Sequence, residues 1–174
     1  ERLNVDRMRA RQLVDTGFLG EYDITASGRV SVATAKLDAV AEWPHVEAPH
    51  PDALVVRLAN AKPVEPIDPA WPERRWTGFS TALGQDELRD SARGWWRVRD
   101  PESWHGHLLV ATIVGFVVGA WTIETHDNGY GGLRRFTVRG ATDAEGANRF
   151  NRHQLHTGSG GNTAILEARD WSSS

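Results

Sequence analysis

The feature that most constrains this chain is an apolar run at residues 108–123, which reads LLVATIVGFVVGAWTI. Valine, isoleucine, leucine, threonine and aromatic residues dominate it, as they do in β-strands, and Gly115 and Gly119 interrupt it as turn or bulge residues do. A transmembrane helix is the alternative, but the run is shorter than the roughly 18–20 residues that span a bilayer and lacks a basic flank. We therefore predict a hairpin over residues 107–124 that forms the centre of the fold.

Length and composition exclude several classes of protein. A chain of 174 residues is long enough to bury a hydrophobic core of its own. The absence of cysteine excludes disulfide frameworks, thiolate zinc sites and cysteine nucleophiles. The chain begins at Glu1 and shows no signal segment, so we expect a cytoplasmic domain taken from a longer protein.

Charge is distributed unevenly along the chain. The formal net charge of −3 argues against binding of nucleic acid by bulk positive charge. Residues 1–70 carry 8 basic and 11 acidic side chains, whereas residues 71–99 hold six arginines against four carboxylates and residues 134–153 hold five arginines against two. Arginine suits forked contacts with phosphates and base edges, although a GC-rich genome would give the same preference over lysine. The acidic part of the protein is therefore the N-terminal part.

Local patterns predict short helices and a larger number of strands. Helices are expected at residues 4–15 with Asn4 as the N-cap, at residues 32–43 with Ser31 as the N-cap, and at residues 86–93, ended by a left-handed Gly94. Beside the hairpin, strands are expected at residues 53–60, 95–98, 134–139 and 163–168. This pattern predicts an α+β fold with a small bent mixed sheet or partly open barrel and short flanking helices.

Two segments between these elements carry further expectations. The connector at residues 62–76 contains four prolines, which exclude regular structure, and Trp71 and Trp76, which predict that it packs against the rest of the protein. The loop at residues 127–132 contains the step from Asn128 to Gly129, which favours a positive φ.

Histidine spacing provides a weak hypothesis of a metal site. His105 and His107 occupy alternating strand positions and face the same side, but a third ligand would have to come from His126, His153 or His156 without a recognised zinc spacing. Scattered polar histidines explain the pattern better, so we predict no metal ligands and no cofactor.

No set of catalytic residues is apparent either. A metal-dependent nuclease would rely on Asn148, Asn151, His153 and His156, without the carboxylates that such enzymes use. Ser159 lies in a glycine loop that has neither the pattern of a nucleophile elbow nor that of a phosphate-binding loop. We therefore favour a binding protein over an enzyme.

Tryptophan is the most informative residue type, with eight in the chain. Trp95 and Trp96 occupy successive strand positions and point to opposite faces, so one can lie in the core while the other lines a surface. Aromatic faces stack on nucleobases, and an extruded base is read in a pocket of that kind. The alternative for each tryptophan is that it fills the core.

Four segments together resemble the PUA-like superfamily, which includes ASCH, EVE and YTH-type modules. They are GWWRV at residues 94–98, the hairpin LLVATIVGFVVGAWTIE, the strand RRFTVRG and the later segment GSGGNTAIL. The resemblance spans residues 86–168 and rests on hairpin pattern and spacing. It is nearest to the modules attached to bacterial modification-dependent restriction proteins.

This resemblance implies a pseudo-barrel that binds DNA or RNA without turnover, with a modified base such as 5-methylcytosine flipped into an aromatic pocket. It implies base-binding roles for Trp95, Trp96, Trp104 and Asn128. It implies phosphate-binding roles for Arg97, Arg134 and Arg135.

On this basis residues 71–174 form the PUA-like β-rich domain. Residues 1–70 form an N-terminal helical and extended segment that matches nothing in the superfamily. Two alternatives stay open: a small-molecule or protein-binding module with an apolar pocket, and a metal-dependent nuclease.

Overall fold

The computed structural model describes residues 3, 5–47, 51–155 and 163–166 of the chain. The described α-helices are α1 (Arg7–Asp15), α2 (Thr34–Ala41) and α3 (Gln85–Ala92). The main sheet contains β3 (Ala53–Arg57), β6 (Gly94–Arg97), β7 (Leu108–Ile113), β8 (Phe116–Asn128), β9 (Leu133–Gly140) and β10 (Thr163–Leu166). Two small ribbons pair β1 (Tyr22–Ile24) with β2 (Val30–Val32) and β4 (Lys62–Pro63) with β5 (Trp76–Thr77). The predicted α+β class is confirmed.

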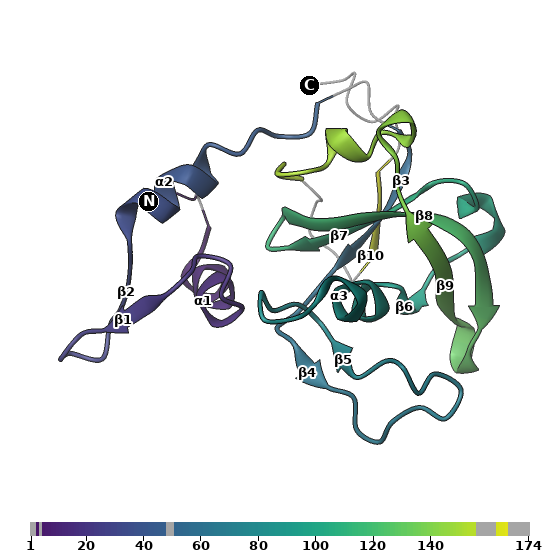
Figure 1. Ribbon diagram of the computed structural model, residues 1–174, viewed down its shortest axis with the longest axis horizontal. Coiled ribbons are helices and arrows are strands. Elements are labelled where there is room, and N and C mark those ends of the chain that lie inside the picture. Colours follow the sequence, from purple (N-terminus) through teal and green to yellow (C-terminus); the bar gives the residue numbers. More distant parts are fainter. Residues whose placement is uncertain (1–2, 4, 48–50, 156–162, 167–174) are drawn as a thin grey trace.

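The main sheet is mixed and curled, as Figure 1 shows. Its strand order is β10-β3-β7-β8-β9-β6, with β3 and β7 parallel and the other pairs antiparallel. The two edge strands, β10 and β6, come near each other: the Thr163 hydroxyl lies 3.4 Å from the Arg97 carbonyl oxygen. This shape is compatible with a small pseudo-barrel.

The central hairpin forms as predicted. Strands β7 and β8 meet at a tight turn in which Val114 and Gly115 have φ values of 53° and 89°. The register shifts opposite Thr112, next to Gly119, where an added Cβ would collide with the Trp121 ring. Among the described residues, no helix is both long and apolar enough to span a membrane.

Both faces of the central strands are covered. Alternate residues of β3 and β7 belong to two different clusters of buried side chains, one on each face of the sheet. The larger cluster includes Phe136 of β9 and is covered by Leu88 of α3 and Leu13 of α1. The smaller cluster is covered by Phe150 and Leu155. Burial on both faces explains why the sequences of these strands are continuously apolar.

The N-terminal segment packs on the sheet through aromatic side chains. Phe18 lies between Trp43 and Phe116, with ring centroids 5.5 Å and 5.2 Å away, and its ring also contacts Phe79. Strand β3 falls within residues 1–70 yet pairs with β7 and β10. The main sheet therefore draws on both sides of the predicted boundary between residues 70 and 71.

Several predicted helix ends are wrong. Helix α1 begins at Arg7 and Asp6 is its N-cap, accepting a hydrogen bond of 2.9 Å from the Arg9 amide, while Asn4 lies outside the described residues. Ser31 does not cap α2, because it pairs in the β1–β2 ribbon and α2 follows Ala33 without a side-chain cap.

Two glycine predictions are also wrong. Gly94 is the first residue of β6 and not a left-handed helix stop. The lack of a side chain matters there because β6 and β9 approach so closely that a Cβ would lie 2.9 Å from Arg135 Cα. In the 127–132 loop, β8 continues to Asn128, and the positive φ values belong to Gly131 and Gly132 instead of Gly129.

A short turn after β9 is held by one carboxylate. Glu145 ends the 3-10 turn Asp143–Glu145 and accepts hydrogen bonds from the Thr142 amide and hydroxyl, each at 2.9 Å. Arg139 Nη1 donates a further bond of 3.0 Å, and Arg139 Nη2 also contacts this carboxylate. The Arg139 guanidinium first, and then Thr142, lower the pKa of Glu145 from 4.5 to about 2.

Glu145→Gln is expected to remove part of the acid sensitivity of the fold. Because the folded-state pKa is depressed, the unfolded chain binds more protons between pH 4.5 and about 2, so stability from Glu145 is lost as the pH falls through that window. Melting temperatures measured from pH 6 to pH 2 should therefore fall less steeply for Glu145→Gln than for the parent. Glu65→Gln, at an exposed position in the connector, is the control. Parallel curves of melting temperature against pH for all three proteins would contradict the depressed pKa of Glu145.

Candidate functional site

The proline-rich connector returns to the sheet and places Trp71 against the ends of β6 and β9. Trp71 is only 1 % exposed. Three guanidinium carbons lie near the centre of its ring, those of Arg93 at 4.6 Å, Arg74 at 4.9 Å and Arg135 at 5.2 Å. A cation within about 6 Å of an indole ring is attracted by the ring quadrupole. We call Trp71, Arg74, Arg93, Trp95 and Arg135 the arginine–tryptophan cluster.

Trp95 completes this cluster from β6. Its ring meets Trp71 edge to face, with centroids 6.1 Å apart and an interplanar angle of 88°. The indole Nε1 donates to Asp68 at 3.3 Å, and the Arg135 guanidinium carbon lies 5.4 Å from the ring centroid. A Cβ at Gly129 would approach the Trp95 ring to 2.8 Å, so a side chain at this position would displace the ring. Trp95 is nevertheless only half-buried.

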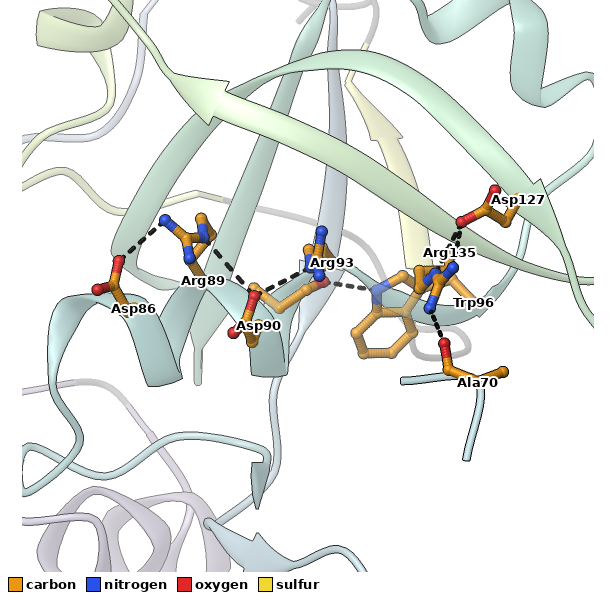
Figure 2. A network of polar contacts seen from close by, with 9 residues as sticks. Ala70, Asp86, Arg89, Asp90, Arg93, Trp96, Asp127 and Arg135 are labelled. Carbon is orange, nitrogen blue, oxygen red and sulfur yellow. Dashed lines mark hydrogen bonds and ion pairs between the residues drawn. The ribbon is translucent and has the colours of Figure 1, made fainter. Parts of the chain in front are cut away.

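Arg135 ties the connector to the sheet. Its Nε donates to Asp127 at 2.8 Å, its Nη2 contacts the same carboxylate oxygen, and its Nη1 donates to the Ala70 carbonyl at 2.9 Å. Figure 2 shows these contacts joining β8, β9 and the connector. Charge-assisted bonds of this kind are stronger than neutral ones. Arg135 therefore fixes the position of Trp71.

A second row of charges runs along α3 toward the cluster. Arg89 pairs with Asp86 at 2.9 Å and with Asp90 at 3.6 Å, and Arg93 Nε lies 3.0 Å from the same Asp90. Next to this row, Trp96 is bound to the end of α3, because its Nε1 donates to the Ala92 carbonyl at 2.6 Å (Figure 2). Burial lowers the pKa of Arg93 below its ordinary value, and Asp90 offsets part of that effect. Asp90 thus holds Arg93 against Trp71.

Arg74 differs from the other arginines of the cluster. Its guanidinium has neither a hydrogen bond nor an ion pair with any residue that the structure describes, and its Nε is buried. Burial is also the main cause that lowers the pKa of Arg74 below its ordinary value. Trp71 Nε1 is a second buried donor without an acceptor in the described part of the chain. Arg93 Nε is a third such donor, with Asp90 3.0 Å away as an ion pair but no hydrogen bond. Buried donors are nearly always paired, so three such donors in one cluster mark a place where a ligand oxygen would be stabilised.

The structure separates the predicted base-binding residues. Trp95 belongs to the cluster, and the exposed Asn128 pairs with Arg134 at the adjoining ends of β8 and β9. Trp96 is half-buried and packs against the larger core cluster, so it and Trp95 contact different parts of the protein, as predicted. Trp104 is 7 % exposed and packs in the same core, with His107 at its edge. We therefore withdraw Trp104 as a stacking residue, because a buried ring has no face for a base.

The predicted phosphate-binding arginines differ in their surroundings. Arg135 is engaged in the contacts described above, whereas Arg97 is exposed. Arg134 donates from Nη1 to the Leu133 carbonyl at 3.0 Å, and its buried Nε has no acceptor among the described residues. The sequence patterns did not mark Trp71, Arg74 and Arg93 as site residues. The one pattern that could have pointed to them was the tryptophans of the connector, which predict that the connector packs against the protein. The burial of Trp71 confirms that prediction.

His105 and His107, the two histidines of the weak metal hypothesis, have different neighbours, because His107 lies at the edge of the Trp104 ring. His105 contacts His126, with 3.1 Å between ring nitrogens, and His126 lies 3.5 Å from Glu102. Over residues 3, 5–47, 51–155 and 163–166, no group of three histidine or acidic side chains is placed to hold a metal ion. His156 and Ser159 lie outside the described residues.

The fold and the cluster define a small α+β protein with a curled mixed sheet and an arginine–tryptophan site at one end of it. The sequence matches no model of a protein family, and no curated protein or solved structure matches it either. Membership of the PUA-like superfamily therefore stays a prediction.

Proposed function

We propose that this chain is a nucleic-acid-binding module that reads a modified base in DNA or RNA, with the arginine–tryptophan cluster at the contact. The observation that supports this most directly is the guanidinium of Arg74, which has no hydrogen bond or ion pair among the described residues and lies over the Trp71 ring, itself in contact with Trp95. A phosphate oxygen would supply the acceptor that Arg74 lacks, and guanidinium groups bind phosphates in a forked geometry.

The contacts within the cluster suggest different roles for its members. Arg93 and Arg135 are already paired with Asp90 and Asp127, so they position the tryptophans. Arg74 is free to bind a phosphate. Trp95, which is half-buried, is the residue that we assign to stacking on a base, in keeping with the way flipped or single-stranded bases are held. Because few arginines of the cluster are unpaired, we expect the affinity for nucleic acid to fall only slowly with rising salt concentration.

Arg74→Ala is expected to weaken binding of a duplex carrying 5-methylcytosine by roughly tenfold and to reduce the slope of log K against log salt by about 1, since one phosphate contact is lost. Fluorescence anisotropy at two or more salt concentrations measures both quantities. Arg75→Ala is the matched control, because its side chain is exposed and the same charge is removed one residue away. Equal effects of the two substitutions would contradict a specific role for Arg74.

Trp95→Ala is expected to weaken binding and to abolish any preference for the modified duplex, because a base–aromatic stacking contact is worth about 1–3 kcal/mol. Trp76→Ala is its control: Trp76 is also half-buried and donates to Glu87 at 3.1 Å, away from the cluster. If no duplex or single strand binds the parent protein at low salt, the proposed function is wrong.

A further inference from the structure

A groove of about 1120 Å³ lies on another part of the molecule, between the N-terminal segment and the sheet. Its walls come from α2 and Trp43, from the segment at residues 79–88 that leads into α3, from the start of β8, and from the short turns that follow β9. We call it the polar groove, and the side chains used below are Phe18, Lys36, Trp43, Asn148, Asn151 and Arg152. Ligand sites in proteins commonly have volumes of about 300–1,000 Å³, so the groove is large enough for a small molecule.

The walls of the polar groove are fixed by hydrogen bonds to one segment. Gln154 donates from Nε2 to the Trp43 carbonyl at 2.9 Å and from its amide to the Pro44 carbonyl at 2.8 Å. On the other side, the Val117 amide donates to the His153 carbonyl at 3.0 Å. The segment that carries Asn151 and Arg152 is thus bound both to the N-terminal part and to β8. A groove with walls held in this way is formed before any ligand arrives.

The lining of the groove combines aromatic side chains with side-chain amides. Trp43 and Phe18 are half-buried, and both are held in place by Phe116, 5.9 Å and 5.2 Å away between ring centroids. Asn148 and Asn151 are exposed, and their side-chain amides bond to no other residue in the described ranges. An amide offers a donor and an acceptor side by side, which is the pattern that reads the edge of a nucleobase.

The charge of the groove favours an anion. Lys36 and Arg152 line it, and neither forms an ion pair with a residue that the structure describes, while Asp143 is the one carboxylate in the lining. Arg152 also has a φ of 54°, in the left-handed region that a residue with a Cβ rarely adopts. Backbone in such a conformation costs of order 1–3 kcal/mol and is concentrated at functional sites.

We propose that the polar groove binds one nucleotide, with the base between the aromatic side chains and the asparagines and the phosphate near Lys36 and Arg152. A planar ring, edge groups for hydrogen bonding and a negative charge are together the properties that the groove matches. The nucleotide can be a free mononucleotide or one residue of a single strand. This proposal rests on the groove alone and does not require the arginine–tryptophan cluster.

Calorimetric titration of the full chain at low salt tests the proposal with four probes: adenosine 5′-monophosphate, cytidine 5′-monophosphate, adenosine and inorganic phosphate. We expect at least one mononucleotide to bind about tenfold more tightly than adenosine or phosphate alone, because each of these offers only part of the contacts. Absence of binding by both mononucleotides overturns the proposal, as does binding of phosphate with the same affinity as the mononucleotides.

Arg152→Gly is the decisive variant. Glycine tolerates the positive φ at this position, so the protein should keep its melting temperature while losing the cation. We expect mononucleotide affinity to fall about tenfold and adenosine affinity to stay the same. Arg149→Ala, which removes a nearby exposed arginine outside the groove, is the control. An equal loss for mononucleotide and nucleoside, or no loss in either, overturns the assignment of the phosphate to Arg152.

A short single strand of deoxyadenosine identifies the source of the nucleotide. Tighter binding of the strand than of the mononucleotide, with the same loss in Arg152→Gly, supports a nucleotide within a strand, whereas equal or weaker binding supports the free nucleotide. The roughly tenfold loss of mononucleotide affinity in Arg152→Gly should be the same in the Arg74→Ala background, because the groove and the cluster share no residue. Failure of the groove proposal and failure of the proposed function at the cluster therefore give different results.

Discussion

Trp71→Ala is expected to lower the free energy of unfolding by about 3–5 kcal/mol, the usual cost of removing a large buried aromatic side chain. Trp71 is 1 % exposed, and its ring is the common contact of Arg74, Arg93 and Arg135. Its removal leaves a cavity and exposes these three positive charges to one another without the intervening π-system. Urea unfolding followed by circular dichroism measures the change.

The matched substitution is Trp76→Ala, five residues along the same connector. Trp76 is half-buried and its indole donates to the exposed Glu87, so we expect a loss of about 1 kcal/mol. Trp71→Phe should fall between the two, because Trp71 Nε1 has no described acceptor and phenylalanine removes no hydrogen bond. A cost for Trp71→Ala no larger than that for Trp76→Ala would show that the connector is not anchored as described.

Gly78→Ala is expected to lower the free energy of unfolding by about 3 kcal/mol, through two separate effects. Gly78 has a φ of 83°, where a side chain costs about 1–2 kcal/mol. In addition, a Cβ at this position would lie 2.6 Å from the Ala59 carbonyl oxygen and closer still to that of Asn60. These are backbone atoms, so the clash requires β5 to move relative to the segment after β3.

Gly20→Ala separates the two effects. Gly20 has a similar φ of 77°, but an added Cβ there has no neighbour within 4 Å. We therefore expect only the conformational cost of about 1–2 kcal/mol, and the difference between the two variants measures the clash at Gly78. Thermal and urea unfolding of both variants provide the comparison. Equal destabilisation by Gly78→Ala and Gly20→Ala would mean that the β4–β5 ribbon shifts without cost.

The elements predicted from local sequence were those with a strong pattern. The hairpin around Gly115 and the strand that contains Phe136 follow from continuous or alternating apolar residues, whose period directly sets the burial of each side chain. Helix caps were predicted less well, because Ser31 has the right chemistry for an N-cap but is used in strand pairing. A cap residue and a strand residue differ only in what lies next to them in space.

The candidate sites were predicted in part. Trp95 and Arg135 were identified from a strand pattern and a resemblance, and the structure brings them together with Trp71 from the connector. The polar groove was not predicted, because Trp43 and Asn151 are more than 100 residues apart and neither belongs to a motif. Their juxtaposition depends on the hydrogen bonds of Gln154 to the chain around Trp43.

The sequence by itself determined the α+β composition, the central hairpin and the buried character of β3 and β7, since these follow from side-chain period and propensity along a few residues. Only the tertiary structure decided which arginines are free. Arg74 and Arg135 are the same residue type, but folding pairs Arg135 with Asp127 and leaves the Arg74 guanidinium without a hydrogen bond or ion pair among the described residues. Whether a charge can bind a ligand depends on the distances to its neighbours, and those distances exist only once distant segments have packed together.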